Sequence, residues 1–170
     1  MLTIIIGGAG SGKSAFAEAH VCRLPGRKIY LAAMIACDGE SRARVEKHRA
    51  QRAGKGFETL ERGFDLENAS IPAGANVLLE DLSNLLANEM YEPAGGGINA
   101  VRRELSFLIG KCENLTVVTN EVFSGGADYD DESLRYMRTL ADLNRELAAQ
   151  ADLVVEVVCG LPNVLKGELP

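Results

Sequence analysis

The sequence lacks a hydrophobic run long enough to cross a membrane, and it lacks an excess of basic residues. No apolar run in its 170 residues approaches the roughly 20 that a membrane-spanning helix needs. Because 24 acidic side chains outnumber 18 basic ones, the net charge of −6 argues against nucleic-acid binding, which requires a basic surface. The sequence starts with an apolar segment in place of a signal or transit peptide, so we expect a cytoplasmic protein.

Residues that build zinc sites are also scarce. The chain has two histidines and four cysteines, and no two cysteines form a C-x-x-C pair. A zinc site needs ligands at closer spacing, so we expect none. In a reducing compartment the cysteines are expected to be buried, small hydrophobic side chains. They are Cys22, Cys37, Cys112 and Cys159.

Short apolar runs alternate with segments of helical periodicity along the chain. The runs are continuously apolar, which is typical of parallel strands buried on both faces. The alternation predicts one α/β domain, residues 1–170, with a mainly parallel sheet, helices on both faces and ligands at the carboxyl ends of the strands. Strands are expected at 2–6, 28–32, 77–80, 116–120 and 153–158, with a further short one at 57–60, and helices at 13–23, 39–53, 82–91, 98–111 and 131–151.

A phosphate-binding loop follows the first predicted strand. The stretch fits G-x-x-x-x-G-K-S/T at every fixed position, whereas a glycine-rich turn without function would not need the lysine and the serine. Backbone N–H groups and the helix N-terminus would bind phosphate oxygens, Lys13 would reach the β- and γ-phosphates, and Ser14 would hold Mg²⁺. The pattern predicts nucleoside triphosphate binding by Gly7, Gly8, Ala9, Gly10, Ser11, Gly12, Lys13 and Ser14.

The predicted strand at 77–80 ends in two acids, Glu80 and Asp81. A carboxylate at a strand end near the phosphates can hold the metal ion or its water. Neighbouring side chains on a strand point to opposite faces, so the pattern alone leaves open which acid serves the site. A solvated acidic strand end is the alternative.

A basic segment stands out in this acidic chain. Arg44, His48 and Arg52 are spaced i, i+4 and i+8, so they share one face of the predicted helix. Between two guanidinium groups the His48 imidazole would stay neutral and nucleophilic, while the arginines hold phosphates. The alternative is a solvated basic helix with an incidental histidine. His20 has no comparable setting and is expected to be structural.

Taken together, these motifs resemble the bifunctional adenosylcobinamide kinase / adenosylcobinamide-phosphate guanylyltransferase family of cobalamin synthesis. The phosphate loop alone identifies only a superfamily, whereas the loop, the basic-segment histidine and T-N-E-V together are far more specific. The matching stretches occur in family order and span nearly the whole chain, at 7–18, 30–32, 44–49 with Arg52, 57–61, 78–80, 84–86, 118–122 and 143–148.

The resemblance implies a RecA-like P-loop NTPase fold, a homotrimer, Mg²⁺, and GTP or ATP as substrate beside a corrinoid, adenosylcobinamide. It implies that His48 becomes guanylylated and that Lys13 is catalytic. Beyond the phosphate loop, it places the nucleotide at Ala32, Ala33, Met34, Arg49, Ala50, Gln51, Arg52, Glu61 and Glu80, with Ser14 and Glu80 at the metal. Rival readings are another small-molecule P-loop kinase without a covalent step, and a RecA-like nucleotide-switch binding module.

The chain departs from the family pattern in three places. Ala33 and Met34 replace small polar residues, the pattern R-D-x-x-G-R-x-N is reduced over 138–144, and an acidic stretch follows T-N-E-V at 123–131. Carboxylates facing a triphosphate would repel it. We therefore expect 123–131 to be a mobile, solvent-facing loop that turns its acids away from the nucleotide and orders only with the corrinoid.

Overall fold

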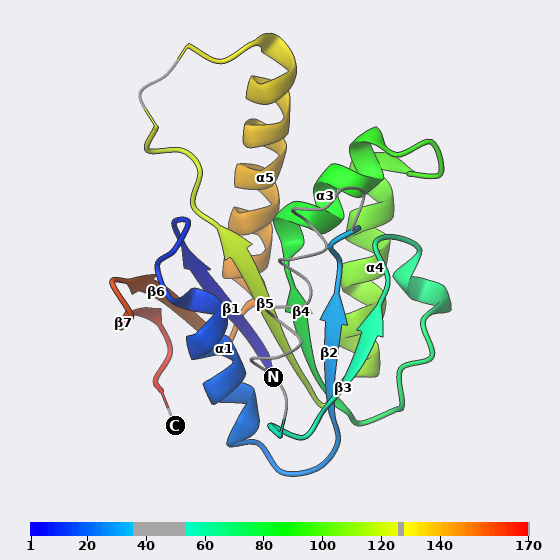
Figure 1. Ribbon diagram of the computed structural model, residues 1–170, viewed down its shortest axis with the longest axis vertical. Helices are drawn as coiled ribbons and strands as arrows, with labels where there is room; N and C mark the ends of the chain where they lie inside the picture. Colours follow the sequence, from blue (N-terminus) through cyan, green and yellow to red (C-terminus); the bar gives the residue numbers. More distant parts are fainter. Residues whose placement is uncertain (36–53, 126–127, 170) are drawn as a thin grey trace.

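A computed structural model describes residues 1–35, 54–125 and 128–169. In this part of the chain seven strands form one sheet in the order β3-β2-β4-β5-β1-β6-β7. All neighbouring strands are parallel except β6 and β7, and the carboxyl ends of the parallel strands meet at the upper edge in Figure 1. The bounds are β1 Leu2–Gly7, β2 Lys28–Ala32, β3 Phe57–Glu61, β4 Asn76–Glu80, β5 Asn114–Asn120, β6 Leu153–Val158 and β7 Leu161–Lys166.

The predicted parallel strands are confirmed, including the short one that became β3. One strand, β7, was not predicted; it pairs antiparallel with β6 at the sheet edge. A two-residue turn connects them, and both of its residues, Cys159 and Gly160, have positive φ angles of 51° and 77°. Such turns usually carry Asn-Gly or Asp-Gly, so Cys-Gly gave no hairpin signal. The same turn exposes Cys159, so the expectation of buried cysteines is wrong there, and Cys22 and Cys112 are only half-buried.

Helices cover both faces of the sheet, as predicted. On one face α1 packs Ala17 and Val21 against Ile5 and Val155, while α3, α4 and α5 cover the other face. The bounds are α1 Lys13–Cys22, α3 Leu82–Tyr91, α4 Gly97–Lys111 and α5 Asp131–Gln150, with a 3-10 helix η1 at Leu66–Asn68. These bounds lie within one residue of the predicted helices, and the helix expected at 39–53 lies outside the described residues.

Apolar contacts on both faces explain why the strands read as continuous hydrophobic runs. Leu79 packs in the cluster beneath α3–α5, whereas its neighbour Leu78 packs in the cluster beneath α1, and both are fully buried. Each such leucine contributes about 1.5–3 kcal/mol of burial free energy, which fixes the strand ends in place. None of the helices described is long and apolar enough to cross a membrane.

Candidate active site

The predicted phosphate loop joins β1 to α1 at the carboxyl edge of the sheet. Its first glycine leaves no room for a side chain, because a Cβ on Gly7 would lie 2.5 Å from Ser11 Oγ and 2.6 Å from Val157 O. Gly12 has a φ of +90°, and a Cβ there would lie 3.1 Å from Gly160 Cα in the β6–β7 turn. The loop is therefore shaped by close backbone approaches that only glycine allows.

A buried cation lies at the start of α1. Lys13 is only 8% exposed, and its Nζ donates a hydrogen bond of 3.2 Å to Gly8 O within the loop. Gly12 at the N-cap provides no side-chain hydrogen bond to the helix. A helix N-terminus without a side-chain cap, together with an ammonium group held over the same loop, favours binding of an anion such as phosphate.

Ser14, in the first turn of α1, contacts the end of β4. Its Oγ donates a hydrogen bond of 2.6 Å to Glu80 Oε1, while Glu80 Oε2 is buried without a partner among the described residues. Burial, and then the negative charge of Asp81, raise the pKa of Glu80 to about 7, although Ser14 and Lys13 oppose the shift. A hydroxyl beside an unpartnered carboxylate oxygen is the hard oxygen donor set that Mg²⁺ prefers, so these residues fit the ion.

Asp81, the other acid at this strand end, contacts α3 and β5 instead of the phosphate loop. Its Oδ1 accepts a hydrogen bond of 2.7 Å from Asn84 N and so caps α3, and its Oδ2 accepts one of 3.2 Å from Asn120 Nδ2. The sequence left open which of the two acids faces the phosphate loop, and these contacts distinguish them. Glu80 faces the phosphate loop, whereas Asp81 fixes the start of α3.

The described part of the predicted nucleotide site gathers at one edge of the sheet. Ala32 is in register with Glu61 on β3 and with Glu80 on β4. Ala33 N donates to Glu80 O at 2.9 Å, and the half-buried Met34 follows at the same edge. The other predicted residues, His48, Arg49, Ala50, Gln51 and Arg52, lie outside the described residues.

Two asparagines that were not assigned to the site hold it together. Asn88 Nδ2 donates to Ala33 O at 2.7 Å and to Gly63 O at 2.8 Å, so it joins the ends of β2 and β3. Asn120 also donates a hydrogen bond of 2.5 Å to Ser83 Oγ. Asn120 belongs to the T-N-E-V stretch and was within reach of sequence reasoning, whereas nothing in the local sequence distinguishes Asn88.

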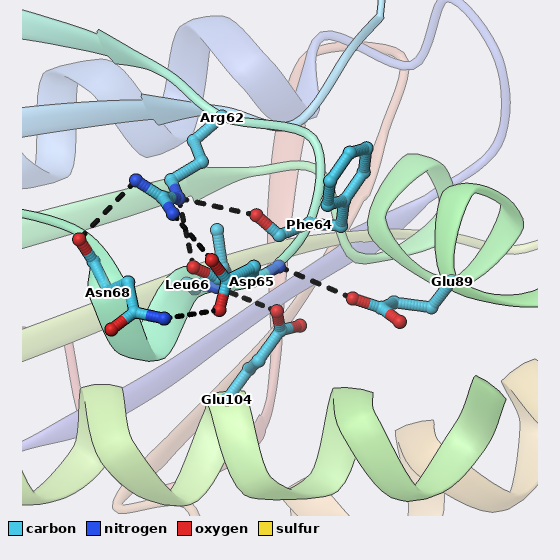
Figure 2. A network of polar contacts seen from close by, with 7 residues as sticks. All are labelled: Arg62, Phe64, Asp65, Leu66, Asn68, Glu89 and Glu104. Carbon is cyan, nitrogen blue, oxygen red and sulfur yellow. Dashed lines mark hydrogen bonds and ion pairs between the residues drawn. The ribbon is translucent and has the colours of Figure 1, made fainter. Parts of the chain in front are cut away.

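The loop after β3 is fixed by a polar network, which Figure 2 shows. Arg62 reaches Asp65 through a hydrogen bond to its main-chain oxygen and an ion pair of 2.7 Å. Glu89 from α3 and Glu104 from α4 accept the N–H groups of Asp65 and Leu66 at 3.4 and 2.7 Å. Burial raises the pKa of Glu104, the Leu66 N–H partly offsets this, and the charge of Glu89 raises it further. The network holds the chain that leaves Glu61 against the helix layer.

The acidic stretch before α5 faces solvent, as expected. Asp128, Asp130 and Asp131 are exposed, and Asp130 caps α5 by accepting a hydrogen bond of 2.7 Å from Ser133 N. That hydrogen bond lowers the pKa of Asp130. His20, expected to be structural, is buried on the last turn of α1, where burial and then Arg23 lower its pKa.

Comparison with known proteins identifies the family. The sequence profile of a family described as cobinamide kinase / cobinamide phosphate guanyltransferase, CobU, matches residues 3–165. The chain belongs to this family. It is thus an enzyme of the kinase and nucleotidyltransferase type, as the resemblance implied.

Three curated relatives align with this family member over nearly their full length. The bifunctional adenosylcobalamin biosynthesis protein CobP of Pseudomonas aeruginosa is 31% identical, with 99% of each chain covered. The proteins named CobU in Escherichia coli and Salmonella typhimurium are 31% and 32% identical, with 98% of this chain and 100% of theirs covered. The resemblance stated from the motifs is confirmed.

Solved structures support the fold independently of sequence. An ATPase of a bacterial type III secretion system superposes with a TM-score of 0.51 at 14% sequence identity. The match covers 96% of this chain and 56% of the ATPase, so the chain spans little more than half of that protein's length. With the phosphate loop and the parallel sheet, the fold is that of a P-loop NTPase, as predicted.

Proposed function

We propose that this enzyme phosphorylates adenosylcobinamide with GTP or ATP and then transfers GMP from GTP to the product, giving adenosylcobinamide-GDP. The observation that carries the proposal is the contact between Ser14 and Glu80 beside the buried Lys13, in a chain that the family profile matches almost throughout. One phosphate site would serve both reactions.

In the first reaction, a hydroxyl oxygen of the corrinoid attacks the γ-phosphorus of the nucleotide. The bond from that phosphorus to the bridging oxygen breaks, the nucleoside diphosphate leaves, and the proton of the hydroxyl passes to water. Lys13 would move from Gly8 O to the phosphate oxygens and balance their charge. Ser14 and Glu80 would hold Mg²⁺, which when bound neutralises charge on the β- and γ-phosphates.

In the second reaction, a ring nitrogen of His48 attacks the α-phosphorus of GTP and pyrophosphate leaves. A phosphate oxygen of the phosphorylated corrinoid then attacks the same phosphorus, the nitrogen–phosphorus bond breaks, and the imidazole is regenerated. Splitting the transfer into two displacements is ordinary covalent catalysis. Arg49 and Arg52 would hold phosphates of the same nucleotide.

The described ends of the segment that carries His48 support this assignment. Ile35 lies just beyond the carboxyl end of β2, where Ala33 bonds to Glu80 O. At the other end, Lys55 Nζ forms an ion pair of 2.5 Å with the buried Glu18 of α1, the helix that begins at the phosphate loop. The segment is thus attached at both ends to elements of the nucleotide site.

Incubation with GTP labelled at the α-phosphate tests the covalent step. We expect the wild-type chain to retain label through denaturation, and the adduct to be acid-labile and base-stable because it is a phosphoramidate. His48→Asn should lose the label yet still transfer labelled γ-phosphate to adenosylcobinamide. His20→Gln, at the other histidine, should keep the label.

Label that persists in His48→Asn would place the nucleophile on another residue. A wild-type chain that phosphorylates the corrinoid but never retains α-label would be a kinase without the covalent step. A chain that hydrolyses GTP with no transfer to a corrinoid would be a nucleotide switch. Each outcome removes a different part of the proposal.

We further propose that the enzyme assembles as a homotrimer and that β7 lies in the interface. On the outer strand of the β6–β7 hairpin, the large hydrophobic side chains are exposed, with Leu161 at 72% and Leu165 at 58%. Val158 and Val164 are exposed beside them, and β7 is the last strand of the described sheet. An apolar edge strand left open to solvent favours aggregation, and a matching copy of the chain would cover it.

A further inference from the structure

A hollow of about 630 Å³ lies between α3, the segment after β5 and the start of α5. Its volume is in the range of small-molecule sites. Aromatic and aliphatic side chains form most of the wall, and Figure 1 shows α5 rising beyond the carboxyl edge of the sheet on this side. The residues that matter for the argument are Tyr91, Val122, Tyr129, Tyr136 and Met137.

Two of the exposed aromatic side chains of the described chain belong to this wall. Tyr129 is 39% exposed and Tyr91 is 46% exposed. The rings of Tyr91 and Tyr136 lie 6.4 Å apart between centroids. Exposed aromatic side chains around a hollow are typical of a binding site, since they leave apolar surface open for a ligand.

Hydrogen bonds connect this wall to the phosphate site. Tyr136 Oη donates to Ser83 O at 3.0 Å, and Asn120 Nδ2 donates both to Ser83 Oγ and to Asp81 Oδ2. Asp81 directly follows Glu80, the residue that contacts Ser14. Burial raises the pKa of Tyr136 to about 12, so its hydroxyl keeps the proton that it donates. A molecule in the hollow would therefore lie next to the elements that hold the nucleotide.

The two acidic side chains of the hollow favour a cationic ligand over an anionic one. Asp130 and Glu132 line the hollow, and their carboxylates would repel a triphosphate. A cobalt(III) corrinoid with an adenosyl ligand carries a net positive charge, because the ring and the adenosyl carbon each balance one of three charges. Its ring edge carries methyl groups, and its periphery carries primary amides that donate hydrogen bonds to carboxylates.

We propose that this hollow binds part of the corrinoid acceptor, with the methyl-bearing ring edge on the tyrosines and Met137 and its amides at the acidic rim. The inference rests on the proposed function, since it assigns the acceptor site of that reaction. It also gives a role to the stretch 123–131, in which the chain departs from the family pattern. Of the acids in that stretch, Asp130 lines the hollow.

Two variants and one matched control test the assignment. Tyr129→Ser removes an aromatic wall, and Ala87→Phe fills the hollow from α3. Phe123→Ser is the control, because Phe123 is 38% exposed in the same stretch but does not line the hollow. The readouts are KM and kcat for adenosylcobinamide in the kinase reaction, and the dissociation constant of a fluorescent GTP analogue.

We expect Tyr129→Ser to raise KM for adenosylcobinamide about tenfold, which is the loss of one good aromatic contact. Ala87→Phe should raise KM at least as much, because the added ring occupies the space of the acceptor. GTP affinity should equal that of the wild type, and this also reports that the variant is folded. The Phe123→Ser variant should leave KM unchanged. Unchanged KM in both hollow variants, or an equal rise in the control, would overturn the assignment, and a rise in the GTP dissociation constant would indicate that the hollow binds nucleotide instead.

A failure of the proposed function gives a different result. In that case the wild type transfers no phosphate to adenosylcobinamide, and the direct binding of adenosylcobinamide, measured by calorimetry without nucleotide, becomes the deciding readout. Binding to the wild type that Tyr129→Ser weakens about tenfold would support the hollow as a corrinoid site without the kinase reaction. No binding to the wild type would refute both assignments.

Discussion

Ser14 Oγ donates a hydrogen bond of 2.6 Å to Glu80 Oε1, across 66 residues of sequence. The bond closes the phosphate loop onto the end of β4 and leaves Glu80 Oε2 buried without a partner among the described residues. Burial of the carboxyl group disfavours its charged form, and with the nearby charge of Asp81 this raises the pKa of Glu80 to about 7.

The first prediction concerns the stability of the nucleotide-free protein against pH. Glu80 has a folded-state pKa of about 7 against an ordinary value of 4.5, so the folded state binds this proton more tightly than the unfolded state. Its stabilising contribution is complete below about pH 4.5 and is lost as pH rises through about 7, at about 1.4 kcal/mol per pH unit and about 3 kcal/mol in all. Urea unfolding without Mg²⁺ at about pH 5 and about pH 8 measures it.

Glu80→Gln should remove this loss, because the amide stays neutral at both pH values. The pKa of Glu104 is raised as well. Its effect on the free energy of unfolding is present in both proteins and therefore cancels when the variant is compared with the wild type. Glu58→Gln serves as the control, since Glu58 is exposed and pairs with Arg27. Parallel stability curves for wild type and Glu80→Gln would show that Glu80 is already ionised in the folded protein.

The second prediction compares two lysines that each donate a hydrogen bond to a nearby glycine carbonyl. Lys13 Nζ bonds to Gly8 O and Lys28 Nζ bonds to Gly26 O, each at 3.2 Å. Only Lys13 lies at the phosphate loop. Lys13→Ala should weaken GTP binding about tenfold to a hundredfold, the loss of a charge-assisted contact of about 1.5–3 kcal/mol. Titration of a fluorescent GTP analogue into Lys28→Ala should give wild-type affinity, and an equal loss in both variants would contradict a specific role for Lys13.

Most of the parallel sheet could be predicted because its strands are apolar in sequence and buried on both faces in the fold. Leu78 and Leu79 point to opposite faces, and both faces are covered, so the sequence shows an uninterrupted apolar run. The phosphate loop was equally predictable, because the chemistry of phosphate binding demands fixed residues at fixed spacing.

Features that depend on distant partners could not be predicted in this way. The choice between Glu80 and Asp81 depends on which strand face meets Ser14, and Asn88 acts on backbone carbonyls of two other loops. Strand β7 was not predicted because Pro162 and the Cys159-Gly160 turn are weak local signals for a strand and a hairpin. Its pairing with β6 depends on its position at the sheet edge.

The third prediction concerns the turn that contacts the phosphate loop. Gly160 N donates a hydrogen bond of 2.8 Å to Ser11 O, and its Cα packs against Gly12. Gly160→Ala should cost about 1 kcal/mol because the φ of 77° disfavours a side chain. The strained turn should also weaken GTP binding through Ser11.

Gly74→Ala is the matched control, with a φ of 72° and open space at its Cβ. We expect the two variants to lose similar unfolding free energy in urea, and only Gly160→Ala to raise the dissociation constant of the GTP analogue. Equal GTP affinity in both would mean that the β6–β7 turn does not support the loop.

The fourth prediction tests the proposed interface on β7. Light scattering after size-exclusion chromatography should give a trimer for the wild type and monomers for the double variant Leu161→Lys with Leu165→Lys. Both side chains are exposed in the isolated chain, so lysine at these positions removes no core contact and the monomer should remain folded. Burying two uncompensated charges in an interface would oppose assembly by several kcal/mol.

Ile109→Lys is the control, since Ile109 is an exposed hydrophobic residue of α4 on another surface. It should leave the trimer intact. If Ile109→Lys dissociates the assembly and the β7 variant does not, the interface lies on the helix layer. If the β7 variant is monomeric and also binds GTP weakly, the β6–β7 turn transmits assembly to the phosphate loop through Gly160 and Ser11, because that turn joins the interface strand to the site.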